Sequence, residues 1–127
     1  FAYRYFGFDD ALYASCRLLE IIANTGKKIS ELLSDVPKTY STPEIRVECP
    51  DDKKFALVKK VTEFFRKNYK IIDIDGVRVL FEDGWGLVRA SNTQPALVLR
   101  FEAMSEKRLK EIRDLVESTL AKIREEL

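Results

Sequence analysis

Hydrophobic residues first recur at helical spacing near the start of the chain. Asp9 or Asp10 is suited to cap a helix there, because a short side-chain carboxylate accepts hydrogen bonds from the first free N–H groups. The pattern continues to about Asn24, and Gly26 follows as a typical helix-ending residue. The apolar stripe of this helix consists of Leu12, Cys16, Leu19 and Ala23, and Leu18 and Ile22 widen it.

Two more amphipathic helices are predicted in the remainder of the chain. One is expected to begin with Asp51 or Asp52 as its cap, and the other with Ser105. The expected buried residues are Phe55, Val58, Val61 and Phe65 in the first of these helices, and Leu109, Ile112, Val116, Leu120 and Ile123 in the second. Charges of both signs alternate along the last helix, as is usual for a face in contact with water.

Short runs of β-branched and apolar residues predict strands between and before these two helices. Turn residues separate the runs, and Asp75-Gly76 is a strong hairpin signal. The expected strands cover residues 45–49, 69–74, 77–81, 85–88 and 96–101. Because hairpins join antiparallel strands, this order predicts an α+β fold: an antiparallel sheet of about four main strands with two helices packed on one face.

Residues 34–44 show no sustained apolar period and contain Pro37 and Pro43, which is typical of a connection between domains. We therefore divide the chain into residues 1–40, which end in this connection, and residues 41–127, which hold the complete sheet and two helices.

Composition excludes several classes of protein. The 22 basic and 21 acidic residues give a net charge of +1, so no basic excess indicates a nucleic acid partner. No apolar run approaches the roughly 20 residues that cross a bilayer, and no secretory signal pattern is present. The chain has no histidine, which excludes a Ser-His-Asp site or a histidine-rich metal site within it. Cys16 and Cys49 lack a paired spacing and are expected to be reduced thiols of a cytoplasmic protein.

A polar loop between the last two expected strands carries a set of donors suited to phosphate. Arg89 offers a planar fork that binds a phosphate through two charge-assisted hydrogen bonds. Ser91 and Thr93 add hydroxyl groups, and Asn92 adds an amide. Pro95 suits the start of the following strand because it has no N–H. The same residue types are also common in plain hairpin loops, so both interpretations remain open from the pattern alone.

Residues 89–95, with the sequence Arg-Ala-Ser-Asn-Thr-Gln-Pro, and the following strand that ends in Phe101-Glu102-Ala103 resemble the phosphate-binding loop of the α-D-phosphohexomutases. The Ser-Asn-Thr form is similar to the phosphomannomutase/phosphoglucomutase branch, whereas phosphoglucosamine mutases more often carry Gly at the position of Asn92. Residues 4–13 and the Leu18-Leu19-Glu20 helix resemble the end of the third domain in the same family. The resemblance therefore implies a remnant of domain three followed by the whole of domain four.

The resemblance also implies a function for the parent enzyme. It would interconvert hexose 1-phosphate and hexose 6-phosphate through a hexose bisphosphate, using a phosphoserine and Mg²⁺ held by mutase domains that this chain lacks. The fragment alone is then not expected to catalyse. The resemblance assigns Arg89, Ser91, Asn92 and Thr93 to the phosphate of the substrate, and leaves open whether the sugar is mannose or glucose.

Residues 73–78 look like part of an Asp-x-Asp-x-Asp magnesium loop, but Val77 stands at the third carboxylate position and a hairpin is favoured.

Arg100 follows an apolar strand well beyond the loop, so we expect its substitution to affect phosphate binding less than that of Arg89. The alternative function is a stand-alone phosphate- or protein-binding α+β module without an enzymatic parent.

Overall fold

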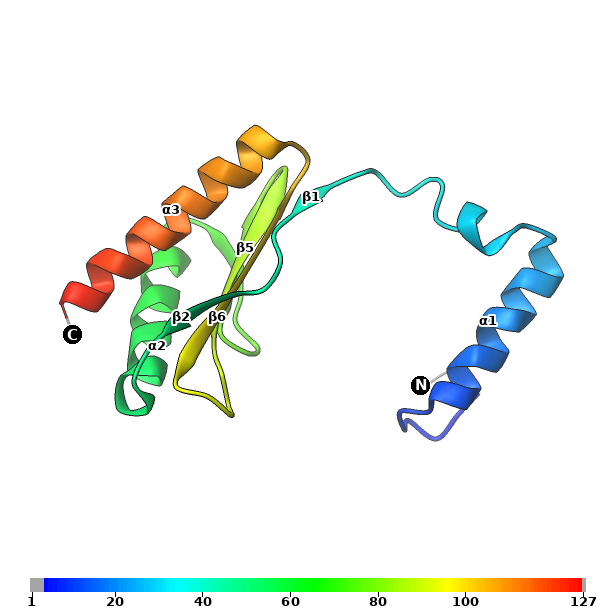
Figure 1. The fold of residues 1–127 in the computed structure, drawn as a ribbon, viewed down its shortest axis with the longest axis horizontal. Helices are drawn as coiled ribbons and strands as arrows, with labels where there is room; N and C mark the ends of the chain where they lie inside the picture. Colours follow the sequence, from blue (N-terminus) through cyan, green and yellow to red (C-terminus); the bar gives the residue numbers. More distant parts are fainter. Residues whose placement is uncertain (1–3, 127) are drawn as a thin grey trace. The chain divides into compact units, whose positions relative to one another are not determined.

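The structure, a computed structural model, describes residues 4–126 (Figure 1). Contacts along the chain divide it into two units, Phe1–Pro37 and Lys38–Leu127, which are described separately below. The aromatic positions Phe1 and Tyr3 lie outside the described residues. Within the described residues, no helix is both long enough and apolar enough to span a membrane.

The first unit consists mainly of helix α1 (Ala11–Thr25), followed by the 3-10 turn η1 (Ile29–Glu31). Asp10 is the N-cap, and its carboxylate accepts hydrogen bonds from the Tyr13 N–H at 2.9 Å and from the Tyr5 hydroxyl at 2.5 Å. The Tyr5 hydroxyl and the Tyr13 N–H lower the pKa of the Asp10 carboxyl, because both stabilise its charged form. Gly26 ends the helix with a φ of 64°, so both predicted boundaries are confirmed.

The apolar stripe of α1 is uncovered in the described residues, since none of its side chains is buried. Leu12 is 80% exposed and Leu19 is 64% exposed. Periodicity reports only that a helix is amphipathic, and the surface that would cover its apolar side must come from elsewhere.

The second unit contains one antiparallel sheet, in which β6 lies between β5 and the edge strands β1 and β2 (Figure 1). The strands are β1 (Tyr40–Ser41), β2 (Ile45–Glu48), β3 (Lys70–Ile72), β4 (Val77–Phe81), β5 (Gly84–Ala90) and β6 (Ala96–Ala103). The sheet order is β1-β6-β5-β4-β3, and β2 pairs with the same edge of β6 as β1. The predicted α+β fold with an antiparallel sheet is confirmed, and the short β1 is an addition that the sequence pattern did not predict.

Strands β1 and β2 follow each other along one edge of β6, with a short interruption between them. Tyr40 pairs with Ala103, whereas Ile45 pairs with Leu99. At the interruption, Thr42 accepts a hydrogen bond from the Phe101 N–H through its hydroxyl and donates its own N–H to the Phe101 carbonyl. Strand β6 therefore keeps its backbone partners where the edge strand breaks.

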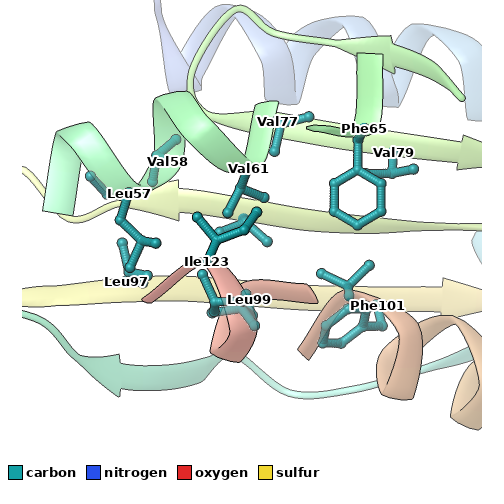
Figure 2. Packing of buried hydrophobic residues seen from close by; sticks show 14 of the residues in the cluster. Leu57, Val58, Val61, Phe65, Val77, Val79, Leu97, Leu99, Phe101 and Ile123 are labelled. Carbon is teal, nitrogen blue, oxygen red and sulfur yellow. The ribbon is translucent and has the colours of Figure 1, made fainter. Parts of the chain in front are cut away.

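Helices α2 (Asp51–Arg66) and α3 (Glu106–Glu125) pack on the same face of this sheet (Figure 1). Figure 2 shows Val61 and Phe65 of α2 directed into the same cluster as Leu99 and Phe101 of β6. Ser105 caps α3 as predicted, by accepting the Arg108 N–H at 3.2 Å. The expected stripe of α3 is also confirmed, with Ile112, Val116, Leu120 and Ile123 buried and Leu109 packed against the core.

Two details of α2 differ from the prediction. Pro50, and neither aspartate, stands at the N-cap, and its carbonyl accepts the N–H groups of Lys53 and Lys54. Asp51 and Asp52 lie in the first turn, where a negative charge complements the helix dipole. In addition, Phe55 is 59% exposed, whereas Lys54 is only 4% exposed. The buried stripe is thus rotated by one residue at the start of the helix, which places a lysine in the core.

Side chains of a strand point alternately to the two faces of its sheet, so each strand contributes one residue in two to the core. In β5 the buried residues include Val88 and Ala90, and in β6 they include Leu99, Phe101 and Ala103. The residues between them face away from α2 and α3. This open face carries the side chains of the candidate site.

Phe65 and Phe55 of α2 provide a test of the packing. Truncation of the fully buried Phe65 to alanine should lower the free energy of unfolding by about 3–5 kcal/mol, because it leaves a cavity in the core. Phe55→Ala, on the exposed side of the same helix, should change it by less than about 1 kcal/mol. Urea denaturation followed by circular dichroism measures both, and equal losses would contradict the observed orientation of α2.

Candidate functional site

The polar loop predicted from the sequence connects β5 to β6. It is closed by hydrogen bonds from the Ser91 N–H to the Ala96 carbonyl at 2.9 Å and from the Ala96 N–H to the Gln94 carbonyl at 2.8 Å. Within the loop, the Ser91 hydroxyl oxygen accepts the N–H groups of Thr93 and Gln94 at 3.4 and 3.2 Å. A hydroxyl has one hydrogen to donate, and the contacts inside the loop use its acceptor sites. These contacts leave the single hydrogen of the Ser91 hydroxyl for donation to another acceptor.

Residues 92–94 of the loop are exposed, and the loop is bounded by the buried residues Ala90 and Ala96. Arg46 of β2 donates to the Gln94 side-chain carbonyl at 2.5 Å and to Glu44 at 2.8 Å. The amide of Gln94 is thus engaged by the protein, whereas the loop places Asn92 and Thr93 toward solvent.

Arg89 is the last residue of β5 to face the open side of the sheet. Its neighbours Val88 and Ala90 point into the core, so the pleat directs the arginine away from the helices. Its Nη1 lies 3.0 Å from a carboxylate oxygen of Asp75, and the two side chains are 40% and 58% exposed. An ion pair with this exposure contributes only about 0–1 kcal/mol, so an incoming anion with more charge can replace the carboxylate.

The hairpin that joins β3 to β4 supplies Asp75, and it packs directly on the backbone of β5. Gly76 has a φ of +79°, and a Cβ at this position would lie 2.3 Å from the Val88 carbonyl oxygen and 2.7 Å from the Arg89 Cα. The predicted Asp75-Gly76 turn is confirmed, and it requires glycine for two reasons: the backbone conformation and the close approach to β5. The turn thereby positions Asp75 next to Arg89.

Sheet register brings two further arginines to the same face. Leu87 of β5 pairs with Arg78 on one side and with Arg100 on the other, one pleat away from Arg89. A hollow of about 330 Å³ lies over this part of the sheet. It is lined by Glu44, Ile72, Ile74, Asp75, Arg78, Leu87, Arg89, Val98 and Arg100.

The hollow places Arg100 closer to Arg89 than their separation in sequence suggests. The sequence separation suggested that Arg100 lies away from the site, but antiparallel pairing places it on the wall of the same hollow as Arg89. The length of the loop between β5 and β6 fixes which residues of the two strands pair. A predicted hairpin of these strands would therefore have indicated that Arg100 lies near Arg89. Arg78 was missed for the same reason.

The structure therefore brings Arg89 together with Arg78 and Arg100 in the hollow. The other three predicted site residues lie in the loop that follows β5. Among the described residues, Ser91, Asn92 and Thr93 do not line the hollow. Arg89 connects the hollow with the loop. It lines the hollow, and only Ala90 separates it from Ser91, the first residue of the loop. With three guanidinium groups against the carboxylates of Glu44 and Asp75, the hollow has an excess of positive charge that suits an anion.

No group of three or more His, Cys, Asp or Glu side chains in residues 4–126 could hold a metal ion. Residues 73–78, which resemble part of a magnesium loop, form the turn and the start of β4 described above. The described residues thus do not fit a Mg²⁺ site of their own.

Family models match both units of the chain. Residues 44–118 match the model described as phosphoglucomutase/phosphomannomutase, C-terminal domain. Residues 1–40 match that of phosphoglucomutase/phosphomannomutase, alpha/beta/alpha domain III. The chain belongs to the phosphoglucomutase/phosphomannomutase family.

Individual members of the family are similar along nearly the whole chain. The phosphomannomutase/phosphoglucomutase of Pseudomonas putida is 42% identical over 127 residues, which cover 98% of this chain and 27% of that protein. The phosphoglucomutase of Neisseria meningitidis serogroup B strain MC58 is 44% identical over 119 residues, covering 90% of this chain and 25% of the relative.

A solved structure agrees with these matches. The crystal structure of a phosphoglucomutase/phosphomannomutase family protein from Burkholderia thailandensis is similar with a TM-score of 0.78 and 38% identity, over 98% of this chain and 26% of that chain. The chain thus spans about a quarter of the length of the family members that it matches.

Substitution of Gly76 tests whether the β3–β4 hairpin packs on the backbone of β5. Gly76→Ala should lower the free energy of unfolding of the second unit by about 2–4 kcal/mol, because alanine adds conformational strain and a clash with the β5 backbone. Asp75→Asn changes the adjacent residue without adding an atom against β5 and should cost at most about 1 kcal/mol. Chemical denaturation of both variants measures this difference. A Gly76→Ala variant as stable as Asp75→Asn would show that the turn does not pack on Arg89.

Proposed function

We propose that this chain is the C-terminal portion of a phosphohexomutase that interconverts hexose 1-phosphate and hexose 6-phosphate through a hexose bisphosphate. In this proposal, residues 1–40 are the end of the third mutase domain with the connection that follows it, and residues 41–127 form the phosphate-binding domain. Family membership and the names of the relatives support the reaction class. The observation that carries the proposed binding role is the position of Arg89, beside a loop of neutral donors and in a hollow with two more arginines.

The proposed role of the second unit is to bind the phosphate that does not react. Arg89 supplies the guanidinium fork nearest the loop, and the hydroxyls of Ser91 and Thr93 with the amide of Asn92 supply neutral donors. Phosphate would replace the Asp75 carboxylate on Arg89, since that ion pair is exposed and weak. Binding energy at this remote phosphate positions the other end of the sugar for reaction and helps to exclude water.

The chemical step belongs to other domains in this proposal. Neither the phosphoserine nor the Mg²⁺ loop of the family is found in this sequence, so the fragment alone should not catalyse. The expected setting is a cytoplasmic enzyme, with the remaining mutase domains as partners of this unit. A mutase assay of the full-length protein with mannose and glucose phosphates tests the reaction and its sugar preference.

Arg89 provides the sharpest test of the binding role. Arg89→Ala should remove a charge-assisted bidentate contact, at a cost of about 2–4 kcal/mol where the site is shielded from water. This corresponds to a roughly 30- to 1000-fold loss of kcat/KM in the full-length enzyme. Arg89→Lys should recover only part of the loss, because an ammonium retains the charge but lacks the planar fork.

A matched control is Arg113 on α3, which is 45% exposed and paired with Glu117 on the far side of the unit from the open face. Arg113→Ala should leave kcat/KM within about twofold of the unsubstituted enzyme. Circular dichroism confirms that each variant folds. If folded Arg89→Ala retains near-normal efficiency, the loop is only a turn and its residues do not bind the substrate phosphate.

Arg100 is expected to contribute to the same site from the neighbouring strand. Arg100→Ala should weaken binding of inorganic phosphate by roughly tenfold, less than Arg89→Ala, because it removes one of the three positive charges of the hollow but not the residue beside the loop. Titration of the 127-residue chain with phosphate at constant ionic strength, followed by NMR, measures this effect. Unchanged affinity in Arg100→Ala would restrict the site to the loop itself.

A further inference from the structure

Lys54 is the one charged side chain that is buried among the described residues, with 4% of its surface exposed. It lies in the first turns of α2, on the side that packs against the sheet. Burial of an ammonium group costs free energy unless hydrogen bonds and an opposite charge compensate it. The contacts of Lys54 therefore indicate how its charge is compensated and which part of the structure it stabilises.

The Lys54 ammonium has two partners. Its Nζ lies 2.6 Å from a carboxylate oxygen of Asp51, one turn earlier in α2, and it donates to the backbone carbonyl of Gln94 at 3.1 Å. The Asp51 side chain is 70% exposed, so this pair joins a buried cation to a carboxylate at the surface. The Gln94 carbonyl is 40 positions away in sequence and belongs to the polar loop.

The segment that leads into α2 also binds the next carbonyl of the loop, that of Pro95. The Cys49 N–H, just before α2, donates to the Pro95 carbonyl at 2.9 Å. The loop is thus attached to the start of α2 at two successive carbonyl groups, one through the backbone of Cys49 and one through the side chain of Lys54. The Gln94 carbonyl also accepts the Ala96 N–H, which closes the loop.

The position of Gln94 has a consequence for the donors of the site. The N–H groups of Thr93 and Gln94 both donate to the Ser91 hydroxyl oxygen, so these contacts occupy its acceptor sites and leave its hydrogen for a phosphate oxygen. Lys54 fixes the carbonyl end of Gln94 and so holds that residue in the orientation that these hydrogen bonds need. Because the Lys54 side chain is 5% exposed, it acts through the loop and does not reach a ligand in the hollow.

We propose that Lys54 is a positioning residue for phosphate binding by the loop of residues 91–95. The inference rests on the proposed function, and it adds a residue on α2 that orders the loop from the core side. Among the described residues, apolar replacement leaves the Gln94 carbonyl with the Ala96 N–H as its remaining partner. The loop then samples other orientations, and the phosphate donors are no longer held in the geometry for binding.

The test separates positioning from loss of charge. Lys54→Met in the 127-residue chain should weaken the binding of inorganic phosphate by at least about fivefold, measured by NMR titration at constant ionic strength. The double variant Asp51→Asn/Lys54→Met keeps the net charge of the native pair and should be weakened to the same extent. Lys60→Met, an exposed lysine on the same helix, removes one charge and should bind phosphate normally.

Each outcome decides the inference. Normal phosphate affinity in folded Lys54→Met would overturn it. Recovery of phosphate affinity in the double variant would also overturn it, because the loss would then come from the change in net charge and not from the position of the loop. If Lys54→Met does not fold, the unsubstituted chain with ¹⁵N-labelled lysine provides the measurement. Saturation with phosphate should shift the Lys54 ammonium signal and leave that of Lys60 unchanged, and an unshifted Lys54 signal would overturn the inference. Absence of saturable binding by the unsubstituted chain would overturn the proposed function and this inference together.

Discussion

Burial of one face of β6 under α2 and α3 is the constraint on which the rest of the second unit depends. Leu97, Leu99, Phe101 and Ala103 alternate along this strand into the core, and they contact residues from both helices. Since the side chains of a strand alternate with period two, packing of these residues directs Arg100 and Val98 to the opposite face. A shift of one residue in register would exchange the two sets, so the hydrophobic core also determines which residues are available for binding.

The same constraint extends to β5 through its pairing with β6. Val88 and Ala90 enter the core, and Arg89 between them faces the open side next to the loop. The β3–β4 hairpin then packs on the backbone of Arg89 through Gly76, which places the Asp75 carboxylate on the guanidinium. Core packing, strand register and a tight turn thus combine to position a single arginine, while helix α2 holds the loop from the core side through Lys54.

Short-range features of the fold were predictable from the sequence because their causes are local. Asp10 and Ser105 cap helices through their own side chains, Gly26 adopts the left-handed conformation at a helix end, and Asp75-Gly76 forms a hairpin turn. The features that were not predicted depend on partners distant in sequence. The Asp51 or Asp52 cap was wrong because the chain enters α2 through Pro50, and the burial of Lys54 in place of Phe55 depends on the carbonyl of Gln94.

The candidate site divides in the same way. The sequence by itself determined the segment of residues 89–95, the donors in it and the family that it resembles, because one continuous segment carries all of that chemistry. Only the tertiary structure decided that Arg78 and Arg100 share a hollow with Arg89, that Asp75 occupies the Arg89 guanidinium, and that Lys54 supports the loop. These relations join residues of different strands and helices, and the register of a sheet with the packing of its helices is a property of the whole fold.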